Sequence, residues 1–115
     1  MLFNSDSGGN YSFTRMTGDG TNATSDRSAA NQTFMELGYY LSSARNMNVI
    51  QIMNYSNTSI YKTVLNRANA QTVNIGAMAF VELWRSTAAI TSITINASGN
   101  YSSGTTFVLH GIKAA

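Results

Sequence analysis

Short runs in which apolar and polar residues alternate recur along the chain, separated by turn residues at intervals of about ten residues. Alternation with a period of two gives a strand one apolar and one polar face, which is typical of a half-buried antiparallel sheet. Many short strands joined by turns are characteristic of sandwiches and jelly rolls. We therefore expect residues 1–115 to form one all-β domain, a single antiparallel β-sandwich of jelly-roll type.

Small polar residues support this expectation and leave few charges for the surface. Ser, Thr and Asn account for 40 of the 115 residues, whereas only seven are Lys or Arg and five are Asp or Glu. Such small polar side chains hydrogen-bond to nearby backbone and favour turns, and Thr also suits a pleated surface. Because few charges guard the strand edges, we expect these edges to be buried in a homo-oligomer, with a trimer favoured.

The N-terminal part of the chain predicts one hairpin followed by a loop. Residues 2–4 and 10–16 form the two strands, and the Gly- and Ser-rich residues 5–9 form the turn between them. Residues 17–32 carry almost no apolar side chains larger than Ala, which predicts a long exposed loop.

Residues 33–41 alternate and predict the next strand. Phe34, Leu37 and Leu41 also recur at helical spacing, so a helix over residues 33–45 is the alternative. The strands expected on either side favour the strand.

The second half of the chain predicts four more strands. Residues 47–55 alternate with apolar residues on both faces, which suits a central strand, and residues 60–65 pair with them as a hairpin. After a polar connection at 66–72, another strand is expected within 73–84, and residues 83–115 predict two strands around a Gly- and Ser-rich turn.

Composition excludes several classes of function. The chain has no Cys, so it has no disulfide, thiolate metal site or Cys nucleophile. Its formal charge is +2, and its basic residues are scattered rather than clustered, which argues against nucleic-acid binding. No apolar run is long enough to cross a membrane as a helix, and residues 1–9 lack the pattern of a signal peptide. We expect no membrane insertion.

No catalytic or metal-binding constellation is visible. His110 is the only histidine and lies in the last predicted strand, where a structural or merely exposed role is expected. The five carboxylates have no spacing that pairs two of them across a cleft. Gly18, Asp19 and Gly20 lack the alternating ligands and terminal Glu of a calcium loop. We expect no enzyme activity, no cofactor and no metal.

Aromatic side chains are the better candidates for binding. Tyr and Trp present rigid amphipathic surfaces that suit protein contacts and stacking on sugars. We take Tyr40, Trp84 and Tyr101 as candidates for contact with a partner or a glycan. Packing in the core or at its rim is the competing interpretation for Trp84.

Three segments carry a resemblance to a known family. The ending GTTFVLHGIKAA resembles the last strand of a β-sandwich family found in tailed-phage virion proteins, where Tyr usually occupies the position of His110. The segments LFNSDSGGNYSFTRMTGDG and MNYSNTSIYKTVLNR resemble a strand–turn–strand unit and a hairpin of the same family. The three segments cover about half of the chain and are more specific for fold than for function.

The resemblance implies a non-enzymatic virion structural protein on the particle exterior, either in a tail fibre or as a capsid decoration protein. Its partners would be other virion proteins. Because relatives carry additional strands upstream, we expect Leu2, Phe3 and Asn4 to lie at an interface formed by strand addition. The alternatives are an adhesin domain that binds host-surface glycans, a carbohydrate-binding module and a small polysaccharide hydrolase.

Overall fold

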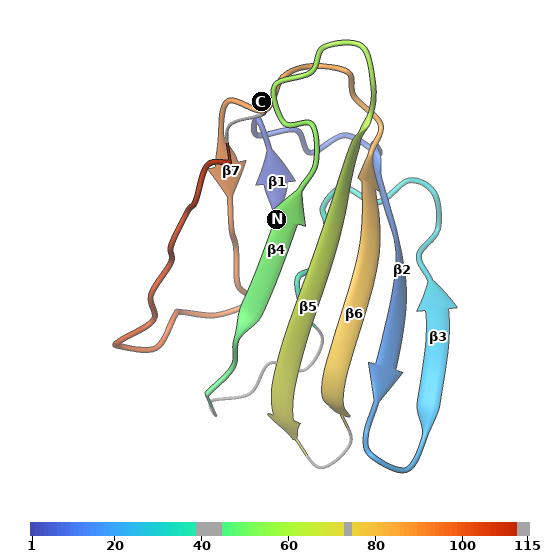
Figure 1. The fold of residues 1–115 in the computed structure, drawn as a ribbon, viewed down its shortest axis with the longest axis vertical. Helices are drawn as coiled ribbons and strands as arrows, with labels where there is room; N and C mark the ends of the chain where they lie inside the picture. Colours follow the sequence, from blue (N-terminus) through green and yellow to red (C-terminus); the bar gives the residue numbers. More distant parts are fainter. Residues whose placement is uncertain (39–44, 73–74, 113–115) are drawn as a thin grey trace.

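The structure, a computed structural model, describes residues 1–38, 45–72 and 75–112. Within these residues it contains seven β-strands and no helix (Figure 1), which confirms the all-β prediction. The strands are β1 (Leu2–Phe3), β2 (Tyr11–Gly18), β3 (Ala23–Arg27), β4 (Asn48–Ile52), β5 (Lys62–Thr72), β6 (Ile75–Trp84) and β7 (Ile93–Thr94).

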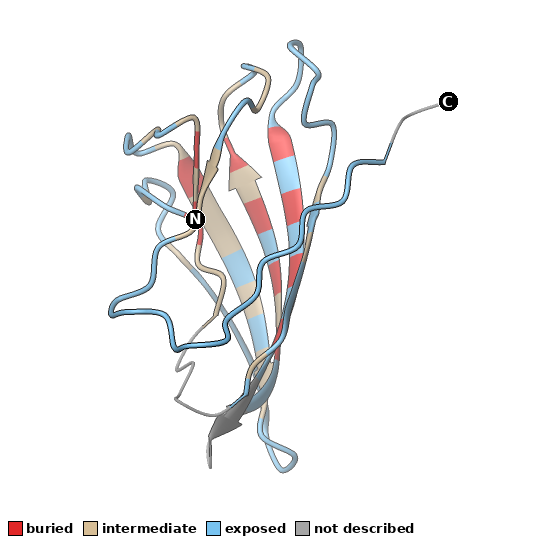
Figure 2. Ribbon diagram, turned by 90° about the vertical axis from the view of Figure 1, so that its left-hand side faces the viewer, coloured by how far each residue is buried: buried red, intermediate tan, exposed pale blue. Residues whose placement is uncertain are grey.

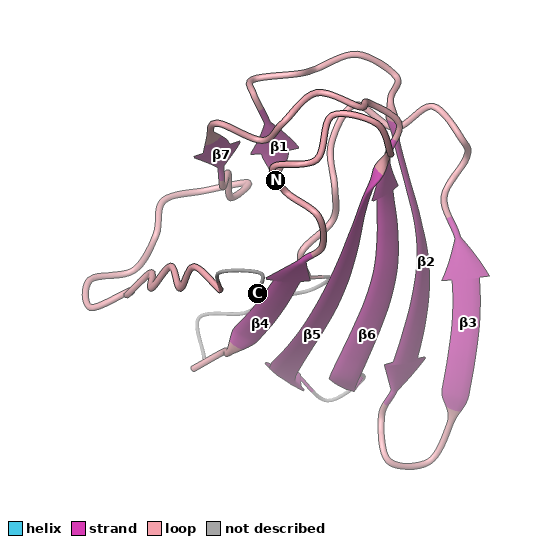
Figure 3. Ribbon diagram, turned by 45° about the horizontal axis from the view of Figure 1, so that its top comes forward, coloured by secondary structure: helices cyan, strands magenta, loops and turns pink. Residues whose placement is uncertain are grey.

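The strands form two antiparallel sheets that do not close on themselves. The larger sheet has five strands in the order β3-β2-β6-β5-β4, and the smaller pairs β1 with β7. Figure 3 shows the small sheet beside the upper end of the large one. The predicted sandwich is not confirmed, because the second sheet consists of two strands of two residues each.

Alternation along β5 and β6 defines the two faces of the large sheet. Val64, Asn66 and Ala68 of β5 are buried together with Met78 and Phe80 of β6. The residues between them point the other way and are mostly exposed, as the bands in Figure 2 show. We call the buried side the inner face and the opposite side the outer face.

The core lies on the inner face and is built around Trp84. The Trp84 ring packs edge-on against Phe3, with ring centroids 5.4 Å apart, and is stacked with Tyr11 at 6.4 Å. These three rings belong to a cluster of six buried residues, and a smaller cluster lies further along the sheet. The first cluster consists of Met1, Phe3, Tyr11, Met35, Val64 and Trp84, and the second of Ala68, Met78 and Phe80.

The predicted hairpin between residues 2–4 and 10–16 is wrong. β1 pairs with β7 instead, with Leu2 opposite Thr94 and Phe3 opposite Ile93. The backbone turns away after β1 because Asn4 and Ser5 both have positive φ angles, of 52° and 56°. Burial of Phe3 against the core then places β1 beside β7.

The region predicted as a long loop contains a strand. β3 pairs with β2 from Thr14 opposite Arg27 to Gly18 opposite Ala23. Asp19 forms the tight turn by accepting hydrogen bonds from the amides of Thr21 and Asn22, at 2.8 and 2.6 Å. The side chains of β3 are all exposed, so its sequence carries no apolar periodicity.

The β4–β5 hairpin and the strand β6 confirm the prediction for the middle of the chain. The polar connection expected at 66–72 is wrong, because β5 continues to Thr72. Asn66 fits within the strand because its side-chain carboxamide donates to the Leu37 carbonyl oxygen at 2.8 Å.

The strand predicted at residues 33–41 does not form in its described part, 33–38, and neither does the alternative helix. Met35 is buried and its amide donates to the Met1 carbonyl oxygen at 2.9 Å, so the segment packs on the core without joining a ladder. Residues 39–41 lie outside the described residues.

The C-terminal third departs most from the prediction. Of the two strands expected there, only β7 forms among the described residues, and it is short. Residues 100–112 are exposed throughout, because no described segment covers them (Figure 2).

Candidate binding surfaces

The outer face of the large sheet is a candidate contact surface. Val81 lies on the central strand β6 and retains 50% of its exposure, although its neighbours across the ladders are Leu65 and Thr14. Met16 and Val49 add further exposed apolar groups on the same face. A sheet whose two faces both carry apolar side chains is typical of a strand layer that is covered on both sides.

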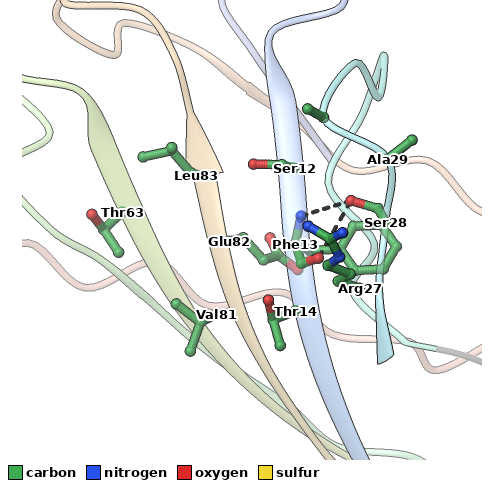
Figure 4. A pocket seen from close by; sticks show the side chains of 11 residues that line it. Ser12, Phe13, Thr14, Arg27, Ser28, Ala29, Thr63, Val81, Glu82 and Leu83 are labelled. Carbon is green, nitrogen blue, oxygen red and sulfur yellow. Dashed lines mark hydrogen bonds between the residues drawn. The ribbon is translucent and has the colours of Figure 1, made fainter. Parts of the chain in front are cut away.

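A shallow depression of about 830 Å³ occupies part of this face (Figure 4). Its rim includes Ser28, whose hydroxyl accepts from the Phe13 amide at 2.9 Å and donates to the Phe13 carbonyl oxygen at 3.3 Å. This pair of bonds fixes the rim to β2. The lining residues are Ser12, Phe13, Thr14, Arg27, Ser28, Ala29, Ala30, Thr63, Val81, Glu82 and Leu83.

The outer face carries positive charge, and the one acidic residue that lines its depression, Glu82, has a buried side chain. The register positions of this face include Arg27 opposite Thr14 and Arg67 opposite Ala79. The chain's five Asp and Glu residues are all described, and they lie in turns, on the inner face or within the core. A partner for this face would therefore be neutral or acidic.

The C-terminal segment, residues 106–112, is a second candidate. Phe107, Val108, Leu109 and Ile112 are 58%, 70%, 82% and 87% exposed. Within the described chain, no hydrogen bond joins residues 107–112 to other residues. Exposed apolar surface of this kind is a candidate for contact with a partner.

Two of the residues predicted to make contacts are buried instead. Trp84 is 2% exposed and Phe3 is fully buried, so neither ring offers a face to a partner or a glycan. The competing interpretation of Trp84 as a core residue is confirmed. Both rings are buried because they pack on each other beneath the small sheet.

The free edge on which the interface at Leu2, Phe3 and Asn4 depends is absent. The Phe3 amide donates to the Tyr11 hydroxyl at 3.1 Å, and the Phe3 carbonyl oxygen accepts from the Asp6 amide at 2.9 Å. The Asn4 carboxamide donates to the Ala89 carbonyl oxygen and accepts from backbone amides at 91 and 92. Leu2 is half-buried. These groups are thus already bonded within the chain.

Tyr101 is exposed, so its ring is accessible to a partner. Its ring packs edge-on against Phe107 with centroids 5.2 Å apart, and its hydroxyl donates to the Ile95 carbonyl oxygen at 2.8 Å. Tyr40 lies outside the described residues.

The Asp6 carboxylate stabilises the core through hydrogen bonds. It accepts hydrogen bonds from Trp84 Nε1 at 2.7 Å and from the Asn10 carboxamide at 2.9 Å. The hydrogen bond from Trp84 is the main reason that the pKa of Asp6 is lowered, and the bond from Asn10 adds to it.

Arg15 joins two carboxylates at the β2–β3 end of the inner face. Its guanidinium contacts Asp26 at 2.6 Å and Glu36 at 3.1 Å. The hydrogen bond from Arg15 lowers the pKa of Asp26, whereas burial raises the pKa of Glu36. The pKa values of Asp26 and Glu36 are therefore shifted in opposite directions. Arg15 lies between these two carboxylates and contacts both.

Glu82 and Lys62 are ionisable groups within the core. Lys62 Nζ donates to the carbonyl oxygens of Ile60 and Thr87 at 2.8 and 3.1 Å. Neither carboxylate oxygen of Glu82 has a hydrogen-bond partner among the described residues. Burial is the main reason that the pKa of Glu82 is raised to about 8, and the Met1 amine partly offsets it.

His110 and the possible metal ligands are the remaining candidates from the sequence. His110 is exposed on the C-terminal segment. Among the described residues, no group of three His, Cys, Asp or Glu side chains is placed to hold a metal ion.

The outer face was not singled out from the sequence, although a signal for it exists. Ala79, Val81 and Leu83 alternate with the buried residues of β6, and Leu65 does the same on β5. Apolar residues on both faces of adjacent strands indicate that the sheet has a second contact surface.

Comparisons with protein-family models, with curated proteins and with solved structures found no match. Within the part of the chain that is described, no helix could span a membrane.

Proposed function

We propose that the chain is a non-enzymatic structural protein on the exterior of a tailed-phage virion and acts through protein–protein assembly. It belongs to a tail fibre or decorates the capsid, and its partners are other virion proteins and further copies of itself, with a trimer favoured. In the assembled particle its sheets are part of a jelly-roll-like β-sandwich.

The observation that carries this proposal is the open outer face. Apolar side chains are exposed on three neighbouring strands, at Leu65, Val81 and Met16, and no carboxylate interrupts them. Contiguous exposed apolar surface on a small protein marks an interaction site. The motifs at both ends of the chain add the resemblance to virion proteins.

The positions of the acidic residues support a role without catalysis. Asp6, Asp26 and Glu36 each bind another side chain, Asp19 closes a turn, and Glu82 is buried in the core. A retaining or inverting hydrolase needs two carboxylates that face a substrate across a cleft. Turnover of a surface polysaccharide that is lost in a Glu36→Gln variant would contradict the proposal.

Immunogold labelling of intact particles of the source phage tests the assignment. We expect gold on the particle exterior, on the shell for a decoration protein or on the tail apparatus for a fibre component. Particles lacking the protein are the matched control. Absence of label from particles that package and infect normally would contradict the proposal.

A glycan-binding adhesin is the second candidate, and the Tyr101–Phe107 pair favours it. Exposed aromatic rings offer flat apolar surface on which sugars stack. In this case the wild-type protein binds a host-surface glycan, and Tyr101→Ala weakens the binding by about tenfold or more. Tyr55→Ala, at an exposed tyrosine in another loop, is the control.

A further inference from the structure

Residues 106–112 combine two features that rarely stay unpartnered. They are extended and apolar, with Leu109 and Ile112 almost fully exposed. They carry no Asp, Glu, Lys, Arg or Pro, so nothing in the segment prevents it from pairing as a strand. Its residues alternate, so that Phe107 and Leu109 share one side and Val108 and Ile112 the other.

The edge strand β4 presents a complementary set of backbone groups. It is the last strand of the large sheet, and among the described residues it pairs only with β5. The Met53 amide donates to the Thr63 carbonyl oxygen and the Asn69 amide donates to the Met47 carbonyl oxygen. Bonding alternates along an antiparallel ladder, so residues 48, 50 and 52 direct their backbone groups away from β5.

The side chains of β4 match the segment as well. Ile50 and Ile52 are only partly buried at the border of the core, and Val49 is exposed on the outer face. A strand added beside β4 would place Phe107 and Leu109 against the two isoleucines. It would also bring Val108 next to Val49. β4 contains no charged residue that would oppose the pairing.

The direction of the segment favours a second copy over the same chain. Figures 1 and 3 show residues 106–112 on the β4 side of the molecule, and in Figure 1 the segment runs in the same direction as β4. Pairing within one chain would therefore be parallel. Every strand pair in the structure is antiparallel, and parallel ladders are slightly less stable per residue.

We propose that residues 106–112 of one copy add as an antiparallel strand to the free edge of β4 in a second copy of this chain. The inference rests on the proposed assembly function and names the contact that would carry it. Because the donated segment and the accepting edge are different surfaces, the contact repeats head to tail, and it forms a ring such as the favoured trimer where the rotation between copies closes.

Cross-linking tests the contact directly, because the chain has no native cysteine. Val49→Cys and Val108→Cys are made in separate chains, which are mixed and treated with a short bismaleimide. We expect a cross-linked pair of chains from the mixture, in excess of either variant alone. Ser25→Cys on β3, exposed at the opposite edge of the sheet, is the matched control for Val49→Cys.

Equal cross-linking of Val108→Cys to Ser25→Cys and to Val49→Cys would overturn the proposal. So would a chain carrying both Val49→Cys and Val108→Cys that cross-links only within itself at all concentrations.

A second measurement separates this inference from the proposed function. Light scattering should show an oligomer for the full wild-type chain and at least about tenfold weaker self-association for Leu109→Asp, because a charge would enter the interface. Ile60→Asp, at an exposed loop position, should assemble like wild type. Unchanged Trp84 fluorescence shows that each variant is folded. If Leu109→Asp assembles normally, the proposed contact between residues 106–112 and β4 is wrong, but the proposed assembly function is retained. A monomeric wild-type chain contradicts both the contact and the assembly function.

Discussion

Replacement of Glu82 by Gln should change how the stability of this protein depends on pH. Glu82 is 1% exposed, and its pKa is raised from 4.5 to about 8 because burial penalises the charged form. In the unfolded chain the carboxyl group ionises near its ordinary pKa. Between these two values the folded state therefore holds a proton that the unfolded state has lost.

The sign and size of the effect follow from proton linkage. Stability falls with rising pH wherever the folded state binds more protons, here by up to about 1.4 kcal/mol per pH unit. Between pH 5 and 7, a group with these two pKa values accounts for a loss of about 2.5 kcal/mol. Gln has no proton to lose, so Glu82→Gln should lack this loss.

The assay is urea unfolding at pH 5, 6 and 7, followed by the fluorescence of Trp84, the only Trp in the chain. Met1 and Glu36 also titrate with shifted pKa values, but both proteins contain these groups, so the difference between the two proteins largely cancels them. Glu82→Met is a companion variant that removes the polar atoms as well as the charge. Parallel stability curves for wild type and Glu82→Gln would refute the reasoning.

Two further substitutions test the core and its border. Trp84→Phe loses apolar volume and the bond to Asp6, so we expect a loss of about 2–4 kcal/mol in urea unfolding followed by circular dichroism, and a stability near wild type would contradict it. Arg15→Met removes the cation between Asp26 and Glu36 and should cost about 1 kcal/mol, because Asp26 is half exposed and screened by solvent. That cost should shrink in high salt, and a salt-independent cost would show that packing rather than charge is responsible.

Strands with regular alternation could be predicted from the sequence. β6 and the first part of β5 bury one set of alternate residues, and β4 partly buries Ile50 and Ile52, so the periodicity of these strands reports their environment. β3 could not be found in this way. Its exposed residues are fixed by the ladder to β2 and by the turn at Asp19, and neither requires apolar side chains.

Strand pairs between distant parts of the sequence could not be predicted either. Nothing in the local pattern of residues 2–4 distinguishes a partner in β2 from one in β7, because the choice depends on where Phe3 is buried. The same limit applies to the binding candidates. An aromatic residue at a strand end suits either core or surface, and the packing of Trp84 on Tyr11 and Phe3 decides for the core.

The order of strands in the large sheet has a consequence for how the chain folds. β4, β5 and β6 are neighbours in both sequence and space, so this three-stranded meander can form from local contacts. β2 joins β6 only after the intervening chain has closed a long loop, which is slow. Until then the edge of β6 is bare and uncharged apart from Glu82, and newly made chains at high concentration can pair there with one another. The slow docking of β2 therefore leaves newly made chains open to aggregation through this edge.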